Sequence, residues 1–195
     1  MGFIPVLLPV ALSPGASFTL AMNSALAGGR GGLLRTLAGT ALGIYTHALL
    51  IGLGVTAILV SSPALFNVLK YAGAAYLMWL GVQLIRSGLT TSEMTLRADG
   101  PTVTLKEAWL ANVLNPKAIV FYLTVVSQFA GSHGDVSHYL LLATVHVLVM
   151  GAWLIALSNV LVFSAQKANP VNVKRVVNLA GGAVLIIFSV LTVVH

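Results

Sequence analysis

The amino-acid sequence predicts an all-α integral membrane protein of six transmembrane helices, arranged as two inverted three-helix repeats. Charged residues make up only 7% of the 195 residues and hydrophobic residues 58%, whereas a soluble domain carries roughly 25% charged residues. Long stretches have no charged side chain: residues 1–29, 36–69, 118–134, 136–166 and 176–195. The second half of the chain also repeats features of the first half in the same order.

Six apolar stretches are long enough to cross a bilayer, which takes about 20 residues for each helix. We place the helices at about 3–26, 37–60, 65–85, 107–129, 138–163 and 175–194, in a single transmembrane domain over residues 1–195. Glycines, prolines and polar residues separate these stretches, and the longest polar stretch is the loop at about 86–106. The short loops leave no room for a soluble domain.

The basic residues predict how the helices are inserted. Eight of the ten lysines and arginines fall in the first, third and fifth loops, namely Arg30, Arg35, Arg86, Arg97, Lys106, Lys167, Lys174 and Arg175. Loops rich in lysine and arginine stay on the cytoplasmic side of the membrane. We therefore expect the loop at about 86–106 in the cytoplasm and both termini on the outside.

Three pairs of sequence segments relate repeat one, about residues 1–88, to repeat two, about residues 104–195. The segment 12–16 (LSPGA) resembles 114–118 (LNPKA), and 72–77 (AGAAYL) resembles 180–185 (AGGAVL). His47 and His146 are each followed by four residues and a glycine. Because each repeat has an odd number of helices, the two repeats have opposite orientations, which is an architecture of secondary transporters.

Two prolines predict that helices 1 and 4 are broken near the middle of the membrane. Pro14 and Pro116 occupy corresponding positions of the two repeats, and a proline removes one hydrogen bond of the helix. Discontinuous helices at corresponding positions indicate a transporter binding site, although prolines that only kink a membrane helix are common too. The predicted substrate-binding residues are Ser13, Pro14, Gly15, Asn115, Pro116 and Lys117.

Lys117 is the charged residue that the predicted helices place nearest the middle of the membrane. Inserting a lysine there costs roughly 2.5–3.5 kcal/mol, and a cost of that size suggests a use. The ammonium is suited to attract a substrate carboxylate, together with the backbone N–H groups at the start of the half-helix. In the structural alternative, Lys117 contacts the free carbonyls before Pro116 or extends toward water.

Two histidines and several glycines complete the set of candidate residues. His47 and His146 fall near mid-membrane depth and titrate near neutral pH, so they are candidates for proton coupling. The alternative is a pair of neutral histidines that each make one hydrogen bond. Small residues let helices approach closely, so Gly39, Gly43, Gly73 and Gly181 predict helix packing within the bundle or in a homodimer.

The composition argues against several other classes of protein. Cysteine is absent, and the four acids, Glu93, Asp99, Glu107 and Asp135, lie in or next to loops. A paired-aspartate protease inside the membrane is therefore excluded, and two histidines alone are an incomplete metal-ligand set. The basic residues are scattered rather than clustered with aromatics, so nucleic-acid binding is not indicated. We expect no enzyme activity, no cofactor and no metal.

Many residues of the chain resemble those of the bacterial amino-acid exporters named for the lysine exporter LysE and the threonine/homoserine exporter RhtB. In the first half the resemblance rests on Ser13-Pro14-Gly15, the glycine-rich loop at 28–32, Gly39-x3-Gly43-x3-His47, and the segments 62–66 and 69–77. It continues through Leu80-Gly81 and residues 85–87, and in the second half through Asn112, residues 114–118 and Gln128-Phe129.

The resemblance implies export of amino acids or close derivatives across the bacterial inner membrane, energised by the proton motive force. Two positions depart from the family's usual pattern. Ala16 stands where members usually have a second proline, and Ile44 stands where many have an aspartate. Without that carboxylate, proton coupling would need His47 or His146. Efflux of metal ions or other cations, and a non-transporting scaffold or assembly factor, remain the alternative functions.

Overall fold

The computed structural model describes residues 2–13, 15–90, 103–130, 135–160 and 170–194. All regular elements within these residues are helices, which confirms the predicted all-α class. They are α1 (Phe3–Leu12), α2 (Ala16–Ser61), α3 (Pro63–Leu89), α4 (Leu105–Val113), α5 (Pro116–Val120), the π-helix η1 (Phe121–Val126), α6 (Ser127–Ala130), α7 (Val136–Ser158) and α8 (Pro170–Val194).

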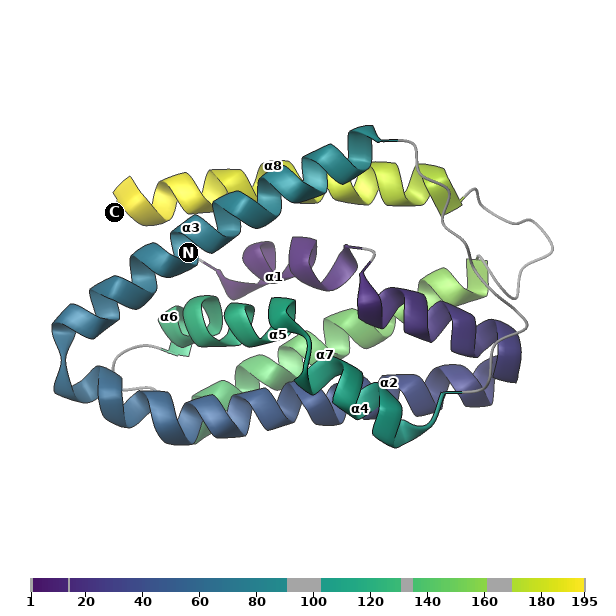
Figure 1. The fold of residues 1–195 in the computed structure, drawn as a ribbon, viewed down its shortest axis with the longest axis horizontal. Helices are drawn as coiled ribbons and strands as arrows, with labels where there is room; N and C mark the ends of the chain where they lie inside the picture. Colours follow the sequence, from purple (N-terminus) through teal and green to yellow (C-terminus); the bar gives the residue numbers. More distant parts are fainter. Residues whose placement is uncertain (1, 14, 91–102, 131–134, 161–169, 195) are drawn as a thin grey trace.

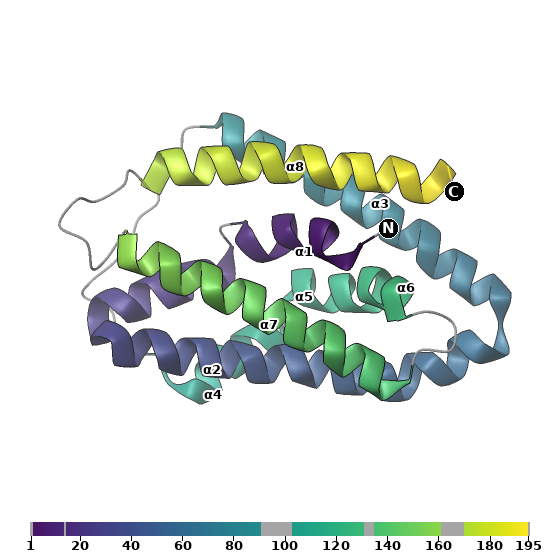
Figure 2. The same ribbon diagram turned by 180° about the vertical axis from the view of Figure 1, so that it is seen from behind.

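The helices lie roughly along the long axis of the molecule in three layers (Figure 1). Helix α3 packs along α8 on one side, and α2 packs against α4 and α7 on the other. The short helices α1, α5 and α6 lie between these two groups, as the view from behind also shows (Figure 2). Helices α1, α5 and α6 are therefore flanked by longer helices on two sides.

Among the described residues, three helices are long and apolar enough to cross a membrane, and a bent pair counts as a fourth if it forms one span. The three are Ser17–Gly54, Val136–Ser158 and Arg175–Val194. The bent pair joins Leu105–Val113 to Pro116–Ala130 at an angle of 54°. These spans and the apolar surface agree with the predicted membrane protein.

The first loop is shorter than the sequence predicted. Hydrogen bonding of helical type continues through Ala16–Ser61, but Gly29 within it has φ 58° and ψ −150°. This backbone region is essentially restricted to glycine, and the chain turns back there (Figure 1). The predicted gap between residues 26 and 37 is therefore mostly helical.

Two interruptions separate consecutive helices where α1 and α4 end. Helix α1 ends at Leu12 and α2 begins at Ala16, which we call the first interruption. Helix α4 ends at Val113 and α5 begins at Pro116, which we call the second interruption. Pro14 lies outside the described residues. At the second interruption Asn115 caps α5, because its Oδ1 accepts the backbone N–H of Lys117 at 3.0 Å.

Two glycines bring α2 close to α4. A Cβ atom added to Gly39 would lie 2.6 Å from the Cβ of Ala108, and one added to Gly43 would lie 2.6 Å from Oδ1 of Asn112. Both distances are far inside van der Waals contact. The backbone of α2 therefore approaches α4 at a separation that only glycine permits at these two positions.

Glycines also lie where α3 and α8 meet their neighbours. A Cβ on Gly73 of α3 would collide with the side-chain amide of Gln128 in α6. A Cβ on Gly181 of α8 would lie 3.1 Å from the Cβ of Pro9 in α1. These contacts hold the two outer helices against the middle layer, which carries both interruptions.

Candidate functional site

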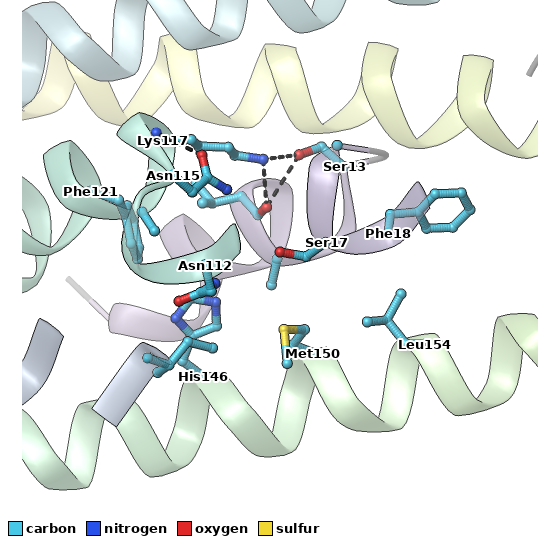
Figure 3. A pocket seen from close by; sticks show the side chains of 15 residues that line it. Ser13, Ser17, Phe18, Asn112, Asn115, Lys117, Phe121, His146, Met150 and Leu154 are labelled. Carbon is cyan, nitrogen blue, oxygen red and sulfur yellow. Dashed lines mark hydrogen bonds between the residues drawn. The ribbon is translucent and has the colours of Figure 1, made fainter. Parts of the chain in front are cut away.

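A cavity of about 60 Å³ lies between the two interruptions. Figure 3 shows the side chains around it, and its polar lining consists of Ser13, Ser17, Asn112, Asn115, Lys117 and His146. Apolar side chains, among them Phe18, Ile44, Phe121, Met150 and Leu154, close the remaining walls. A volume of this size holds a few water molecules, so the structure has a small cavity with six polar side chains in its lining.

Lys117 reaches from α5 to the end of α1. Its Nζ donates hydrogen bonds to the backbone oxygen of Val10, at 2.8 Å, and to Oγ of Ser13. The Ser13 hydroxyl also donates to the Val10 oxygen, at 3.2 Å. Residue 14 is a proline and has no N–H to offer the carbonyl four residues earlier. The ammonium of Lys117 therefore satisfies the carbonyl that this proline leaves without its helical donor.

His47 plays the corresponding part at the second interruption. Pro116 has no N–H for the carbonyl of Asn112, and that oxygen accepts the backbone N–H of Asn115 at 3.0 Å. It also lies 3.3 Å from Nε2 of His47, in α2. Because a carbonyl oxygen can only accept, Nε2 of His47 carries a proton and donates it here.

Tyr122 lies between the two histidines that the sequence singled out. Its ring centroid is 5.8 Å from that of His47 and 5.8 Å from that of His146. The Tyr122 hydroxyl and Nδ1 of His146 are 3.2 Å apart and hydrogen-bonded. All three side chains are buried. The histidines are thus linked through one tyrosine, in the π-helix η1, rather than in direct contact.

The structure brings together most of the predicted site residues. Ser13, Gly15, Asn115, Lys117 and His146 line the cavity. Pro116 begins α5 but is exposed and does not line the cavity. His47 does not line it either and reaches the site through its hydrogen bond to Asn112.

Several lining or bridging residues were not among the predicted site residues, and Tyr122, Asn112 and Ile44 are the most informative of them. Tyr122 carries no signal in the sequence, because nothing at the matching position of the first half resembles it. Asn112 was one of four amide residues expected to cap a helix or line the polar path, and its place four residues before Pro116 marks the freed carbonyl. Ile44 is 1% exposed and lines the cavity, so the aspartate usual in the resembling exporters would face this site.

The charge of Lys117 has no acidic partner among the described lining residues. Of the acids in the described part of the chain, Glu107 bonds to Thr104 at the exposed start of α4, and Asp135 caps the exposed start of α7. The part of the chain that the structure describes includes no cluster of three or more metal-binding side chains. The Lys117 ammonium therefore meets only neutral acceptors in the structure.

Comparison with known proteins gives one family over nearly the whole chain. Residues 8–195 match the family described as LysE type translocator. A homoserine/homoserine lactone efflux protein of Salmonella typhimurium is 33% identical over 72% of this chain and 69% of its own length. An uncharacterized membrane protein of Bacillus subtilis, YrhP, is 26% identical over 98% of this chain and 97% of its own. No solved structure matches the chain.

Proposed function

Because the chain belongs to the LysE type translocator family, we propose that it exports small amino acids or their close derivatives from the cytoplasm. The Salmonella relative that is named for homoserine and homoserine lactone efflux supports this substrate class. The single observation that carries the proposal is the Lys117 ammonium at a cavity without an acidic partner among the described lining residues. A cation in such a place favours a ligand that brings a carboxylate.

The ammonium has a donor left for a substrate. Lys117 has three N–H donors, and two of them bond to Val10 and Ser13. The third is available to a carboxylate that enters the cavity, beside the capped start of α5. In this proposal Ser13, Pro14, Gly15, Asn115, Pro116 and Lys117 belong to the substrate site, and Ser13, Gly15, Asn115 and Lys117 are the ones that line the cavity.

We further propose six transmembrane spans in the inner membrane. They are α1 with α2 as far as Gly29, the remainder of α2, α3, α4 through α6, α7 and α8. The first three spans and the last three form inverted repeats, whose broken helices meet at the cavity, and both termini face outward. Alternating access then arises from movement of one repeat against the other around the two interruptions.

Proton coupling is assigned to the linked side chains of His47, Tyr122 and His146. The tyrosine hydroxyl can both donate and accept, and each histidine can change its protonation state. His146 also lines the cavity, so a change in its protonation would be felt by a bound solute. On this proposal the proton motive force drives export.

Replacing Lys117 with methionine tests the substrate site. Lys117→Met keeps the length and apolar bulk of the side chain but removes its charge. We expect export of homoserine to fall about 10-fold to 100-fold, the range for losing a hydrogen bond to a charged group, while export of homoserine lactone, which has no carboxylate, changes little. Efflux is measured from cells and normalised to the inserted protein.

Lys70→Met in α3 is the matched control, because it removes a lysine from a helix that does not line the cavity. It should leave both fluxes unchanged. If Lys117→Met lowers homoserine and lactone export equally, or lowers neither, the carboxylate binds elsewhere and Lys117 is structural.

Reporter fusions test the proposed orientation. A reporter joined after residue 195 should appear outside the cell, and one inserted in the loop at about 86–106 should appear inside, because the basic loops stay cytoplasmic. A cytoplasmic C-terminus would mean an odd number of spans or the reverse insertion.

A further inference from the structure

The two interruptions differ in whether a polar group beside them remains without a hydrogen-bond partner. Val10 and Asn112 each stand four residues before a proline, and their sequence positions differ by the same 102 residues that separate the prolines. At the end of α1, the Val10 oxygen holds the ammonium of Lys117. At the end of α4, the Asn112 backbone oxygen is taken by His47 and Asn115, but the side-chain Oδ1 of Asn112 has no hydrogen-bond partner.

An unpartnered oxygen at this place is unusual. Asn112 is 5% exposed and its side chain lines the cavity, as Figure 3 shows. Buried side-chain carbonyls are nearly always hydrogen-bonded, and an exception calls for a missing partner. Rotation about the Cβ–Cγ bond is enough to present either the oxygen or the NH2 group of this amide to the cavity.

The surroundings of this oxygen favour a cation. Asn112 lies in the last turn of α4, a helix of nine residues, and the carbonyl end of a helix attracts positive charge. The end of α1 already binds an ammonium, that of Lys117, in the equivalent place. In the structure Oδ1 lies against Gly43, since a Cβ there would lie 2.6 Å from it, so the amide has to turn to present this oxygen to a ligand in the cavity.

We infer that Asn112 Oδ1 accepts a hydrogen bond from the α-ammonium of the transported solute. This inference rests on the proposed function and adds a second recognition point to it. Lys117 holds the carboxylate near the first interruption, and Asn112 holds the ammonium at the second. The substrate class is thereby narrowed to solutes with a free α-amino group, because a hydroxyl in its place brings no charge to this end of α4.

Two ligands separate this recognition point from the carboxylate site. Homoserine lactone has the α-ammonium without a carboxylate, whereas 2,4-dihydroxybutyrate has the carboxylate and a hydroxyl in place of the ammonium. Binding of each is measured by calorimetry on the full-length protein in lipid nanodiscs. We expect Asn112→Leu to weaken lactone binding about 10-fold to 100-fold and to change dihydroxybutyrate binding by less than about twofold.

Two further variants distinguish recognition from structure. Asn112→Asp keeps an acceptor oxygen and should retain lactone binding. Asn178→Leu is the matched control, since Asn178 is 1% exposed and also has an unpartnered Oδ1, but it does not line the cavity. It should leave the binding of both ligands unchanged.

The inference is overturned if Asn112→Leu weakens both ligands equally, if Asn112→Asp loses the lactone as well, or if the unaltered protein binds neither ligand. The second result would mean that the Asn112 amide donates a hydrogen bond to the lactone carbonyl instead of accepting one from the ammonium. Binding is measured without transport, so the test of this site and the test of the proposed export function can fail independently of each other. A protein that binds the lactone through Asn112 but exports nothing from loaded cells would retain this site and lose the assignment as an exporter.

Discussion

The two helix interruptions face the same chemical problem and meet it with different groups. In each, a proline leaves the carbonyl four residues earlier without its helical donor. At the first interruption the side-chain nitrogen of Lys117 donates a hydrogen bond to the Val10 oxygen. At the second interruption His47, a residue type whose charge depends on pH, donates a hydrogen bond to the Asn112 oxygen.

This difference teaches that related interruptions need not be interchangeable. Each freed carbonyl in one half of the chain is satisfied by a side chain from the other half, so the halves are tied together twice. The first tie places the side-chain nitrogen of Lys117 at the cavity. The second connects Asn112 through His47 and Tyr122 to His146. One end is suited to an anion and the other to a cation or a proton.

The largest effect is expected from adding one methyl group beside the second interruption. Gly43→Ala would put a Cβ 2.6 Å from Oδ1 of Asn112, and overpacking of this kind costs about 1–3 kcal/mol. Gly15→Ala at the first interruption should cost less than about 0.5 kcal/mol, since its Cβ would have a nearest neighbour at 3.9 Å. Thermal unfolding in detergent measures the loss of stability in both variants. Equal losses would contradict the predicted steric difference between the two interruptions.

Replacing both linked histidines should remove the pH-dependent part of transport. In a His47→Gln, His146→Gln variant, the glutamine amide at position 47 still has an N–H for the Asn112 oxygen, but neither side chain titrates. We expect export that no longer responds to a pH gradient, measured in vesicles with the gradient imposed. His138→Gln, at the exposed start of α7, is the control and should keep the response. Full gradient-driven export by the double variant would place the proton path elsewhere.

Removing the Ser13 hydroxyl should have a smaller effect at the first interruption. Ser13→Ala deletes one acceptor of Lys117, but the Val10 oxygen still holds the ammonium. The loss is expected to be about 1 kcal/mol, or about a fivefold weaker binding of homoserine. A loss as large as that of Lys117→Met would mean that the hydroxyl, rather than the ammonium, contacts the substrate.

The smallest effect is expected from the caps of the two half-helices of the bent span. Thr104 caps α4 at the exposed end, accepting the backbone N–H of Glu107 at 3.2 Å, and Asn115 caps α5 beside the cavity. Replacing either with alanine should cost about 0.5–1 kcal/mol of stability. Only Asn115→Ala should also lower the homoserine affinity, and an equal change of affinity in Thr104→Ala would contradict this.

Sequence reasoning reached the class of the protein because composition alone decides it. A chain with 7% charged residues cannot cover a soluble surface, and the same patterns led to the residues that surround the cavity. Lys117 was identified because its charge stood out against a long apolar background. Its acceptor was not, since the sequence suggested the carbonyls before Pro116, whereas the structure joins Lys117 to Val10.

The remaining features depend on contacts that no local pattern encodes. Tyr122 looks like an ordinary apolar-helix tyrosine until the fold places His47 and His146 on either side of it. Similarly, the glycines near residue 29 predicted a loop, but one residue with positive φ turns the chain and the neighbouring residues stay helical. Tertiary packing, rather than propensity, decides both outcomes.

The π-helix has a consequence for the angular phase of the fourth proposed span. A π-turn contains one residue more than an α-turn, and each residue of an α-helix advances the phase by about 100°. Residues after η1 are therefore rotated by about this angle from where a continuous α-helix starting at Pro116 would place them. Gln128 owes its position against Gly73 to that rotation. A helical wheel drawn through the whole span would assign Lys117 and Gln128 to the wrong relative faces.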